Sequence, residues 1–259
     1  MPANWLILGS GGLVSGILAG LLGIGGGTIL VPLLVALNYA PVQAVATSSL
    51  AILITSVSGT LQNWRMGYFN GKQVIYLGFP ALATAQVGVY WASRVAPYFL
   101  LAAFGLLLLL NIYLVDLRKR LVAKGSSTTQ TYSNPLVARL GTGGAAGILA
   151  GLFGVGGGVI MVPLQILLLG ENIKTAIQTS LGVIVITAIS ACIGHSLAGN
   201  VLTPEGLLLG MGGLVGAQIS TRFLPKLPDA IVSLIFRGFL GALSLYIFWQ
   251  AWQSYRSLA

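Results

Sequence analysis

The stretch GILAGLLGIGGGTILVPLL at residues 16–34 returns later in the chain as GILAGLFGVGGGVIMVPLQ at residues 147–165. The two segments are identical at 14 of 19 positions and lie 131 residues apart. Chance does not produce this identity, even in glycine-rich membrane sequence. Secondary transporters are commonly built from internal repeats, with the substrate site between the repeats near the bilayer midplane. The stretch therefore predicts a chain of two related halves.

The composition places both halves in a membrane. Of the 259 residues, 56% are hydrophobic and only 7% are charged, whereas a soluble domain carries about 25% charged residues. A membrane-spanning helix needs about 20 mainly apolar residues. Candidate spans are 5–22, 43–62, 73–93, 98–117, 137–153, 175–194, 204–223 and 229–251. We therefore expect an all-α, polytopic membrane protein with about four transmembrane helices in each half. The first apolar run lacks the basic segment of a signal peptide, so we expect it to be retained as a helix.

The hydrophilic segment RKRLVAKGSSTTQTYSNP divides the chain nearly in half. It predicts a first membrane repeat over residues 1–117, a cytoplasmic linker over 118–136 and a second membrane repeat over 137–259. Each repeat also contains a short, proline-containing apolar piece, at 28–38 and 159–169.

These short pieces leave the topology open. If each is a re-entrant half-helix, every half crosses four times and the repeats are parallel. If each crosses, every half has five spans and the repeats are inverted. The length of the pieces favours the half-helix, whereas the placement of Lys and Arg favours inversion. Both alternatives place the linker in the cytoplasm, because Lys and Arg gather in cytoplasmic loops.

Glycines supply the first candidate functional feature. Gly12, Gly16 and Gly20 recur every four residues, which predicts close packing against another helix. The later runs Gly25–Gly27 and Gly156–Gly158 should instead break the helix, because consecutive glycines lose much backbone entropy on folding. The amide groups that start the following half-helix could then bind an anion. A flexible hairpin without a ligand is the alternative.

Polar residues inside the spans supply the second feature. Ser48 and Ser49 align with Thr179 and Ser180 at the 131-residue offset, and Gln86 aligns with Gln218 after one insertion. Their neutral donors suit an oxyanion, which carboxylates would repel. We expect these paired residues to complete a substrate site with Gly25, Gly26, Gly27, Gly156, Gly157 and Gly158. Hydrogen bonding between helices is the alternative for each.

Three further residues are candidates for contact with a proton or an anion. Asn63 and His195 lie near the ends of matching spans, and His195 is the only histidine. A histidine titrates near neutral pH, although a satisfied interfacial histidine is the more common case. Arg237 lies inside the last span, where it either extends to the interface or supplies positive charge to a cavity.

Other classes of protein fit the sequence poorly. The chain has only four acidic residues and one cysteine, Cys192, which excludes an internal disulfide and a cysteine metal cluster. No nucleophile with a base, zinc motif or phosphate-binding lysine motif is present, so we expect no enzyme, no metal and no cofactor. The net charge of +9 lacks the basic, aromatic-interleaved stripe of a nucleic-acid-binding protein.

At its duplicated motifs, GLLGIGGGTILVP and GLFGVGGGVIMVP, the chain resembles the sulfite exporter TauE/SafE family of membrane permeases. The resemblance covers essentially the whole chain. It implies a secondary transporter in the cell inner membrane that moves small sulfur-containing anions such as sulfite, sulfonates or sulfoacetate, usually outward. The expected partners are this anion and the lipid bilayer, and a homo-oligomer is left open. Uptake or channel-like passage of another anion, such as a carboxylate, and a non-transporting assembly subunit are the alternatives.

Overall fold

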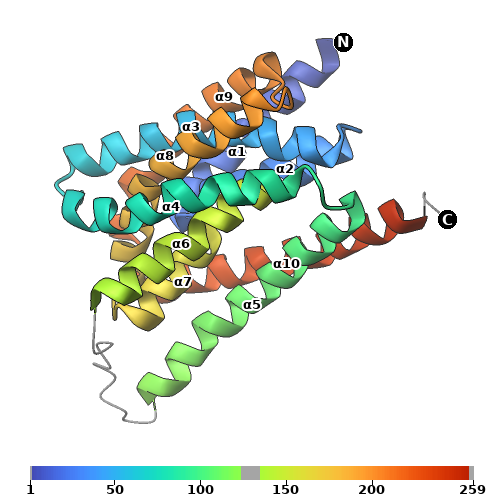
Figure 1. The fold of residues 1–259 in the computed structure, drawn as a ribbon. Helices are drawn as coiled ribbons and strands as arrows, with labels where there is room; N and C mark the ends of the chain where they lie inside the picture. The colour runs from blue at the N-terminus through green and yellow to red at the C-terminus, as the bar shows by residue number, and fades with distance from the viewer. Residues whose placement is uncertain (1, 124–134, 257–259) are drawn as a thin grey trace.

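The structure is a computed structural model that describes residues 2–123 and 135–256, which form helices joined by short connections (Figure 1). The helices of the first half are α1 (Pro2–Leu22), α2 (Gly27–Ala36), α3 (Pro41–Arg65), α4 (Gly71–Ala92) and α5 (Pro97–Ala123). Those of the second half are α6 (Pro135–Phe153), α7 (Gly158–Leu168), α8 (Ile173–Leu197), α9 (Thr203–Phe223), the 3₁₀ helix η1 (Leu224–Lys226) and α10 (Asp229–Arg256).

The helices confirm an all-α, polytopic membrane protein. Seven are long and apolar enough to span a bilayer, at Trp5–Leu22, Pro41–Arg65, Gly71–Ala92, Leu136–Phe153, Ile173–Leu197, Thr203–Lys226 and Asp229–Gln253. The predicted span at 98–117 lies within α5. Parts of the predicted linker are helical, because α5 continues to Ala123 and α6 begins at Pro135, while residues 124–134 lie outside the described residues. The division into two repeats and a linker stays a prediction.

The short helix α2 turns back along α1. The Ser15 hydroxyl donates to the Gly26 carbonyl oxygen, and the side chain of Leu33 packs against Gly11. Residue numbers therefore rise along α2 as they fall along α1. The two helices form a hairpin that begins and ends at the same end of the molecule, so α2 is a re-entrant half-helix.

Corresponding helices of the two halves run in opposite directions. Helix α9 lies parallel to α3, because the Leu202 amide donates to Thr47 and the Ser58 hydroxyl donates to the Leu214 carbonyl. Helix α4 lies parallel to α8, because Val74 contacts Gly182 and, further along both helices, Gly78 contacts Ile186. Helix α4 follows α3 in the chain and runs back in the opposite direction. Helix α3 therefore runs antiparallel to its counterpart α8, and α4 runs antiparallel to its counterpart α9. The two halves are therefore inverted relative to each other.

Helices α5 and α10 show the same inversion. Gly105 on α5 contacts Phe248 on α10, and further along α5 Ile112 contacts Gly241. The residue numbers rise along one helix as they fall along the other, so α5 and α10 are antiparallel neighbours.

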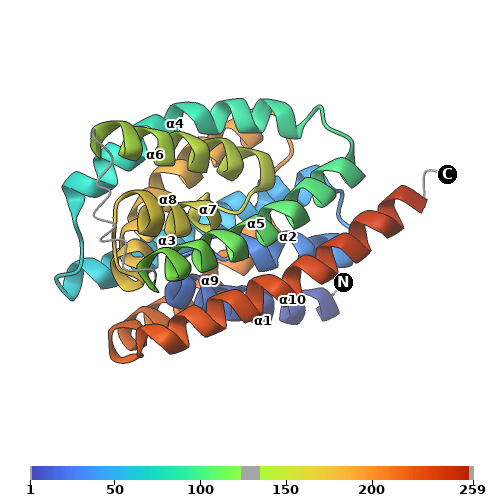
Figure 2. The same cartoon turned by 90° about the horizontal axis from the view of Figure 1, so that it is seen from below.

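The topology thus combines features of both predicted alternatives. Each half has a re-entrant hairpin and three further long helices. After these three helices, an odd number, the chain is at the opposite end of the molecule, so the second half starts there and is inverted. Of the two alternatives left open, the contacts favour inverted repeats, because α1 and α2 return together to their starting end. Figures 1 and 2 show the start of α1 and the end of α10 at one end, here called the terminal side, and the end of α5 and the start of α6 at the other, here called the linker side.

The small-residue faces pack as predicted. A methyl group on Gly12 or Gly16 of α1 would overlap the backbone of Leu209 or Gly213 on α9. The matching glycines of α6, at 143, 147 and 151, lie equally close to the backbone of α4. Helix α1 therefore packs against the second half and α6 against the first, which holds the two inverted halves together.

Candidate functional site

The two glycine breaks have the same backbone conformation. Positive φ angles between 60° and 80° occur at Gly23, Gly25, Gly26, Gly154, Gly156 and Gly157. Residues with side chains rarely adopt this left-handed conformation, which costs them roughly 1–2 kcal/mol. Consecutive left-handed residues cannot continue an α-helix, so α1 and α6 end here and α2 and α7 begin in new directions.

The breaks touch each other at the centre of the molecule. A methyl group at Gly27 would overlap the Gly154 carbonyl oxygen, and one at Gly158 would overlap the Gly23 carbonyl oxygen. Around them lie four fully buried aliphatic side chains, Ile24, Ile52, Val155 and Ile184. The breaks therefore form one closed junction between the two halves.

Two helix N-termini open onto this junction. The cap residues of α2 and α7 are Gly26 and Gly157, and neither offers a side-chain hydrogen bond to its helix. The first amides of an α-helix have no carbonyl partner within the helix. They also carry the positive end of the helix dipole, which attracts anions. Thr28, in the first turn of α2, is fully buried, and its hydroxyl has no partner among the described residues.

Two predicted site residues, Ser48 and Ser180, lie at the junction but already donate to it. The Ser48 hydroxyl lies 2.7 Å from the Gly154 carbonyl oxygen, and the Ser180 hydroxyl lies 2.7 Å from the Gly23 carbonyl oxygen. Each serine thus ties its own long helix to the break of the other half. In this conformation both serines form structural hydrogen bonds between the halves. Hydrogen bonding between helices is the alternative to a substrate site that the sequence left open for them.

The same contacts correct the predicted register. Ser48 and Ser180 occupy equivalent positions, 132 residues apart, so Thr47 corresponds to Thr179. The predicted pairing of Ser48 with Thr179 and of Ser49 with Ser180 is therefore shifted by one residue. The reason is that α7 has 11 residues where α2 has 10. An insertion inside an apolar helix leaves no visible gap in the sequence.

The other predicted polar residues lie away from the junction. The Gln86 amide donates to the backbone oxygen and hydroxyl of Ser190, and the Gln218 amide donates to the Ser58 carbonyl oxygen. Ser49 donates to its own helix, to the Val45 carbonyl. Thr179 is buried on α8. The glutamines join α4 to α8 and α9 to α3.

Asn63, His195 and Arg237 are not brought together. Asn63 lies near the linker-side end of α3, fully buried, and its amide has no partner among the described residues. His195 is buried near the terminal-side end of α8, where Nε2 lies 3.1 Å from the Gly151 carbonyl oxygen. Arg237 is half-buried in α10. The first two occupy matching positions at opposite ends of the molecule.

One matched pair of contacts was missed in the sequence. The Tyr39 hydroxyl lies 3.4 Å from a Glu205 carboxylate oxygen on the terminal side. On the linker side the Gln73 amide lies 3.0 Å from a Glu171 carboxylate oxygen. Tyr39 and Glu171 both follow a half-helix and lie 132 residues apart, as do Gln73 and Glu205. Burial and the neighbouring Glu205 raise the pKa of Tyr39 above its usual value, so its hydroxyl stays protonated and donates. The corrected offset would have paired these residues in the sequence.

A pocket of about 600 Å³ opens on the terminal side, next to the C-terminal end of α2. Its lining is Val35, Ala36, Asn38, Tyr39, Pro41, Leu101, Tyr246, Trp249, Gln250 and Gln253. None of these side chains is basic or acidic. The pocket joins α2 and the start of α3 to α5 and α10. No local motif predicted it, because its residues come from both halves.

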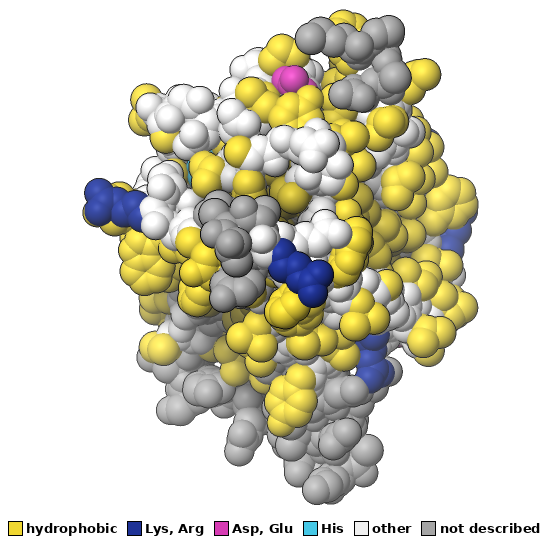
Figure 3. All heavy atoms as spheres, turned by 90° about the vertical axis from the view of Figure 1, so that its right-hand side faces the viewer, with side chains coloured by type: hydrophobic (Ala, Val, Ile, Leu, Met, Phe, Trp, Pro, Cys, Tyr) yellow, Lys and Arg dark blue, Asp and Glu magenta, His cyan; other side chains and the backbone are white. Residues whose placement is uncertain are grey.

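Basic side chains gather at the opposite end of the molecule. Among the described residues, the linker side holds Arg65, Lys72, Arg139, Lys174, Arg222 and Lys226, whereas the terminal side holds Arg94 and Arg256. Figure 3 views the terminal side and shows mainly hydrophobic and uncharged side chains. Large hydrophobic side chains such as Phe79 and Leu234 are exposed along the flanks, as expected of a surface that faces lipid.

Inverted halves, re-entrant helices that meet at the centre and an apolar outer surface define a polytopic membrane protein of the transporter class. The family model described as sulfite exporter TauE/SafE matches residues 8–247. The chain therefore belongs to this family, as its two glycine motifs predicted.

The names of similar proteins agree with the assignment to the transporter class. The chain is 26% identical to the probable membrane transporter protein YunE of Bacillus subtilis, over 90% of this chain and 93% of that protein. It is 27% identical to a probable membrane transporter protein of Xylella fastidiosa, over 95% of both chains. No solved structure matches the chain. These relatives indicate a membrane transporter rather than an enzyme.

Proposed function

We propose that the protein is a secondary transporter of a small sulfur-containing oxyanion, such as sulfite or a sulfonate, and that it works as an exporter in the cell inner membrane. The observation that carries this proposal is the meeting of two uncapped helix N-termini at the central junction. Membership of the sulfite exporter family supports the choice of a sulfur anion.

The distribution of charge supports an orientation. Lys and Arg mark the cytoplasmic side of a membrane protein, and they gather on the linker side. In the proposed orientation the linker is cytoplasmic, both chain termini are outside, and an exported anion leaves through the terminal side.

The closed junction supports alternating access. The two breaks pack against each other, and fully buried aliphatic side chains surround them, so the junction is closed in this conformation. In the proposed cycle the two halves move relative to each other, and the first-turn amides of α2 and α7, with Thr28, contact the anion once the junction opens.

Thr28 gives the sharpest test, because its hydroxyl has no hydrogen-bond partner to lose among the residues that the structure describes. We expect Thr28→Val to fold normally and to reduce sulfite flux about tenfold in vesicles that contain only the purified protein, since a hydrogen bond to a charged group contributes about 1.5–3 kcal/mol. Thr142→Val is the matched control, because the Thr142 hydroxyl on α6 is also buried and has no partner in the described part of the chain.

The outcomes separate this proposal from its rivals. Flux of sulfite or sulfoacetate, stimulated by unlabelled substrate on the far side, would identify a carrier, whereas flux without such stimulation would indicate a channel. Selective flux of acetate would indicate a carboxylate transporter. A folded protein that transports none of these anions would favour an assembly subunit. Equal flux in the two threonine variants would remove Thr28 from the site.

A further inference from the structure

Two grooves lie side by side on the outer surface of α3, in the half of this helix nearer the linker side. The α3–α9 groove has a volume of about 510 Å³ and is lined by Leu53, Ile54, Val57, Ser58, Leu61, Arg65, Leu214 and Gln218. The α3–α8 groove has a volume of about 320 Å³ and is lined by Val57, Thr60, Leu61, Trp64, Phe69 and Val185. Val57 and Leu61 belong to both linings, so they form a ridge between the two grooves.

Both grooves lie on the surface that faces lipid. The ridge residues Val57 and Leu61 are exposed, and so is Leu214 on the far wall of the α3–α9 groove. Leu53 and Arg65, at the two ends of that groove, are 12 residues apart in α3, which is about 18 Å of helix. One leaflet contributes half of a hydrocarbon core that is about 30 Å thick. The groove therefore runs along about the depth of one leaflet, as the acyl chain of a lipid does.

Two arginines lie at the linker-side end of the α3–α9 groove. Arg65 lines the groove directly. On the other wall, Arg222 follows Leu214 and Gln218 at four-residue spacing, which places it on the same face of α9. Helices α3 and α9 run parallel, and each arginine lies in the last turn of its helix. The two guanidinium groups therefore belong to the same end of the groove.

The positive charge of this arginine pair has no counterpart in the described part of the chain. Both side chains are exposed, and neither has a hydrogen bond or an ion pair with a described residue. The three carboxylates that the structure describes already contact Tyr39, Gln73 and Lys174. Trp64, next to Arg65, is 64% exposed, and tryptophan is typical of the headgroup level of a membrane. Guanidinium groups bind phosphate through paired hydrogen bonds, so this end of the groove suits a lipid phosphate.

We propose that the two grooves and the arginine pair form a binding site for one anionic phospholipid. The phosphate lies between Arg65 and Arg222, and the two acyl chains lie on either side of the ridge formed by Val57 and Leu61. Basic pockets between transmembrane helices on the cytoplasmic side are typical sites for anionic lipid headgroups, and the linker side is cytoplasmic in the proposed orientation. The bound lipid joins α3 of the first half to α8 and α9 of the second.

The test is a lipid titration of the purified, full-length protein in detergent micelles, measured by native mass spectrometry. Dioleoyl phosphatidylglycerol is the anionic probe, and dioleoyl phosphatidylcholine has the same chains without net charge. We expect phosphatidylglycerol to bind at least about tenfold more tightly, because each arginine near the headgroup contributes about fivefold. Lysophosphatidylglycerol, which has one chain, should bind more weakly, and glycerol 3-phosphate, which has none, should not bind measurably.

Arginine variants show where the headgroup binds. Arg65→Gln and Arg222→Gln should each weaken phosphatidylglycerol binding about fivefold, and the double variant about twenty-five-fold, with phosphatidylcholine binding unchanged. Arg94→Gln is the matched control, because Arg94 is an exposed arginine that lies on the terminal side and lines neither groove. A monodisperse elution profile checks that each variant is folded.

Each outcome decides the inference. Selective binding of phosphatidylglycerol that falls in the two groove variants and not in Arg94→Gln supports it. Equal binding of the two diacyl lipids, or equal losses in Arg65→Gln and Arg94→Gln, would indicate general attraction of charged lipid and overturn it. Glycerol 3-phosphate that binds as tightly as phosphatidylglycerol would indicate a site for free phosphate and overturn it as well. Sulfite flux enters none of these measurements, so the lipid site and the proposed function stand or fall separately.

Discussion

The terminal side and the linker side of this molecule are built from equivalent helices but packed differently. On the linker side α7 packs closely against α5, whereas on the terminal side the equivalent α2 barely touches α10, and the pocket lies beside it. The polar contacts follow the same trend, because the Gln73–Glu171 distance is 3.0 Å and the Tyr39–Glu205 distance is 3.4 Å. One end is therefore closed and the other is partly open.

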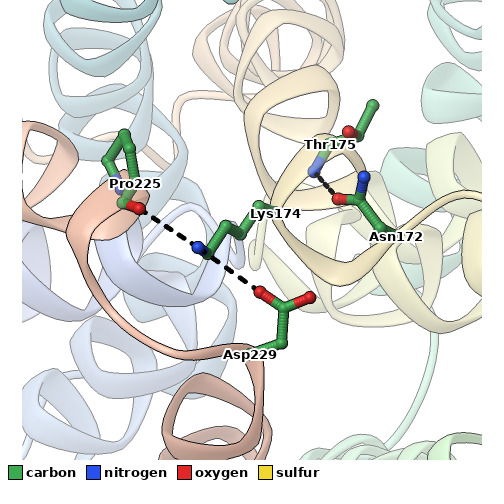
Figure 4. Close-up of polar contacts among 5 residues, drawn as sticks. All are labelled: Asn172, Lys174, Thr175, Pro225 and Asp229. Atoms are coloured by element: carbon green, nitrogen blue, oxygen red, sulfur yellow. Dashed lines mark hydrogen bonds and ion pairs between the residues drawn. The ribbon is translucent and has the colours of Figure 1, made fainter.

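Charged contacts add to the closed end. Figure 4 shows Lys174 between the Pro225 carbonyl oxygen, at 3.1 Å, and the Asp229 carboxylate, at 3.4 Å. This contact joins the start of α8 to the α9–α10 connection. The residue of the first half that corresponds to Lys174 is Val42. An ion pair therefore cannot form at the equivalent place on the terminal side.

The difference suggests how the transporter would change state. When two inverted halves differ in conformation, exchange of the two conformations closes the open end and opens the closed one. In this hypothesis the loose α2–α10 seam and the tight α7–α5 seam exchange their packing. In this hypothesis the central junction is closed in both end states and opens to the anion between them.

The largest expected effect comes from breaking that junction. Gly27→Ala places a methyl group against the Gly154 backbone oxygen, which no side-chain rotation can relieve. Overpacking of a close-packed site typically costs about 1–3 kcal/mol, so we expect sulfite flux to fall about tenfold to a hundredfold. Gly238→Ala is the control, because a methyl group there has no atom within 4 Å. Unchanged flux in a correctly folded Gly27→Ala protein would show that the two breaks need not touch.

The second-largest effect is expected from removing the hydrogen bond between Gln73 and Glu171 on the linker side. We expect Gln73→Ala to free Glu171 and to favour opening of the linker side, whereas Tyr39→Phe should not. Gln165, fully buried on α7, provides the reporter as Gln165→Cys in a Cys192→Ser background. Loss of one hydrogen bond contributes about 1 kcal/mol, which should speed maleimide labelling of this cysteine about fivefold.

The matched variant makes that experiment decisive. Equal labelling rates in Gln73→Ala and Tyr39→Phe would contradict the assignment of the two contacts to opposite ends. Faster labelling in Tyr39→Phe alone would reverse it.

The sequence predicted the parts of this architecture that local chemistry determines. Glycine runs break helices wherever they occur, so the positions of both breaks followed from composition, as did the close packing of the Gly12–Gly16 face. Family membership followed from the same motifs. The re-entrant half-helix also followed, because the apolar pieces are too short to span a bilayer.

Inversion and the site depended on contacts between distant residues. Whether α1 crosses alone or returns with α2 depends on the direction of the chain after Gly26, which local sequence does not specify. In the sequence, Ser48 and Gln86 look alike, because each is a polar residue inside a predicted span. Ser48 lies at the junction and Gln86 lies between α4 and α8 because of how whole helices pack. The pocket draws on both halves, so no single segment predicted it.

The smallest expected effect belongs to the ion pair of the closed end. Lys174 and Asp229 are 27% and 58% exposed, and pairs this open to solvent contribute less than about 1 kcal/mol. Asp229→Asn should therefore lower the free energy of unfolding only slightly, and the difference should vanish in 1 M salt, where the Debye length is about 3 Å. Lys174→Met should cost somewhat more, because it also removes the bond to the Pro225 carbonyl. Reversible denaturation in mixed micelles measures both values. A loss of several kcal/mol in Asp229→Asn would mean that this pair, rather than the packing of α7 against α5, holds the linker side closed.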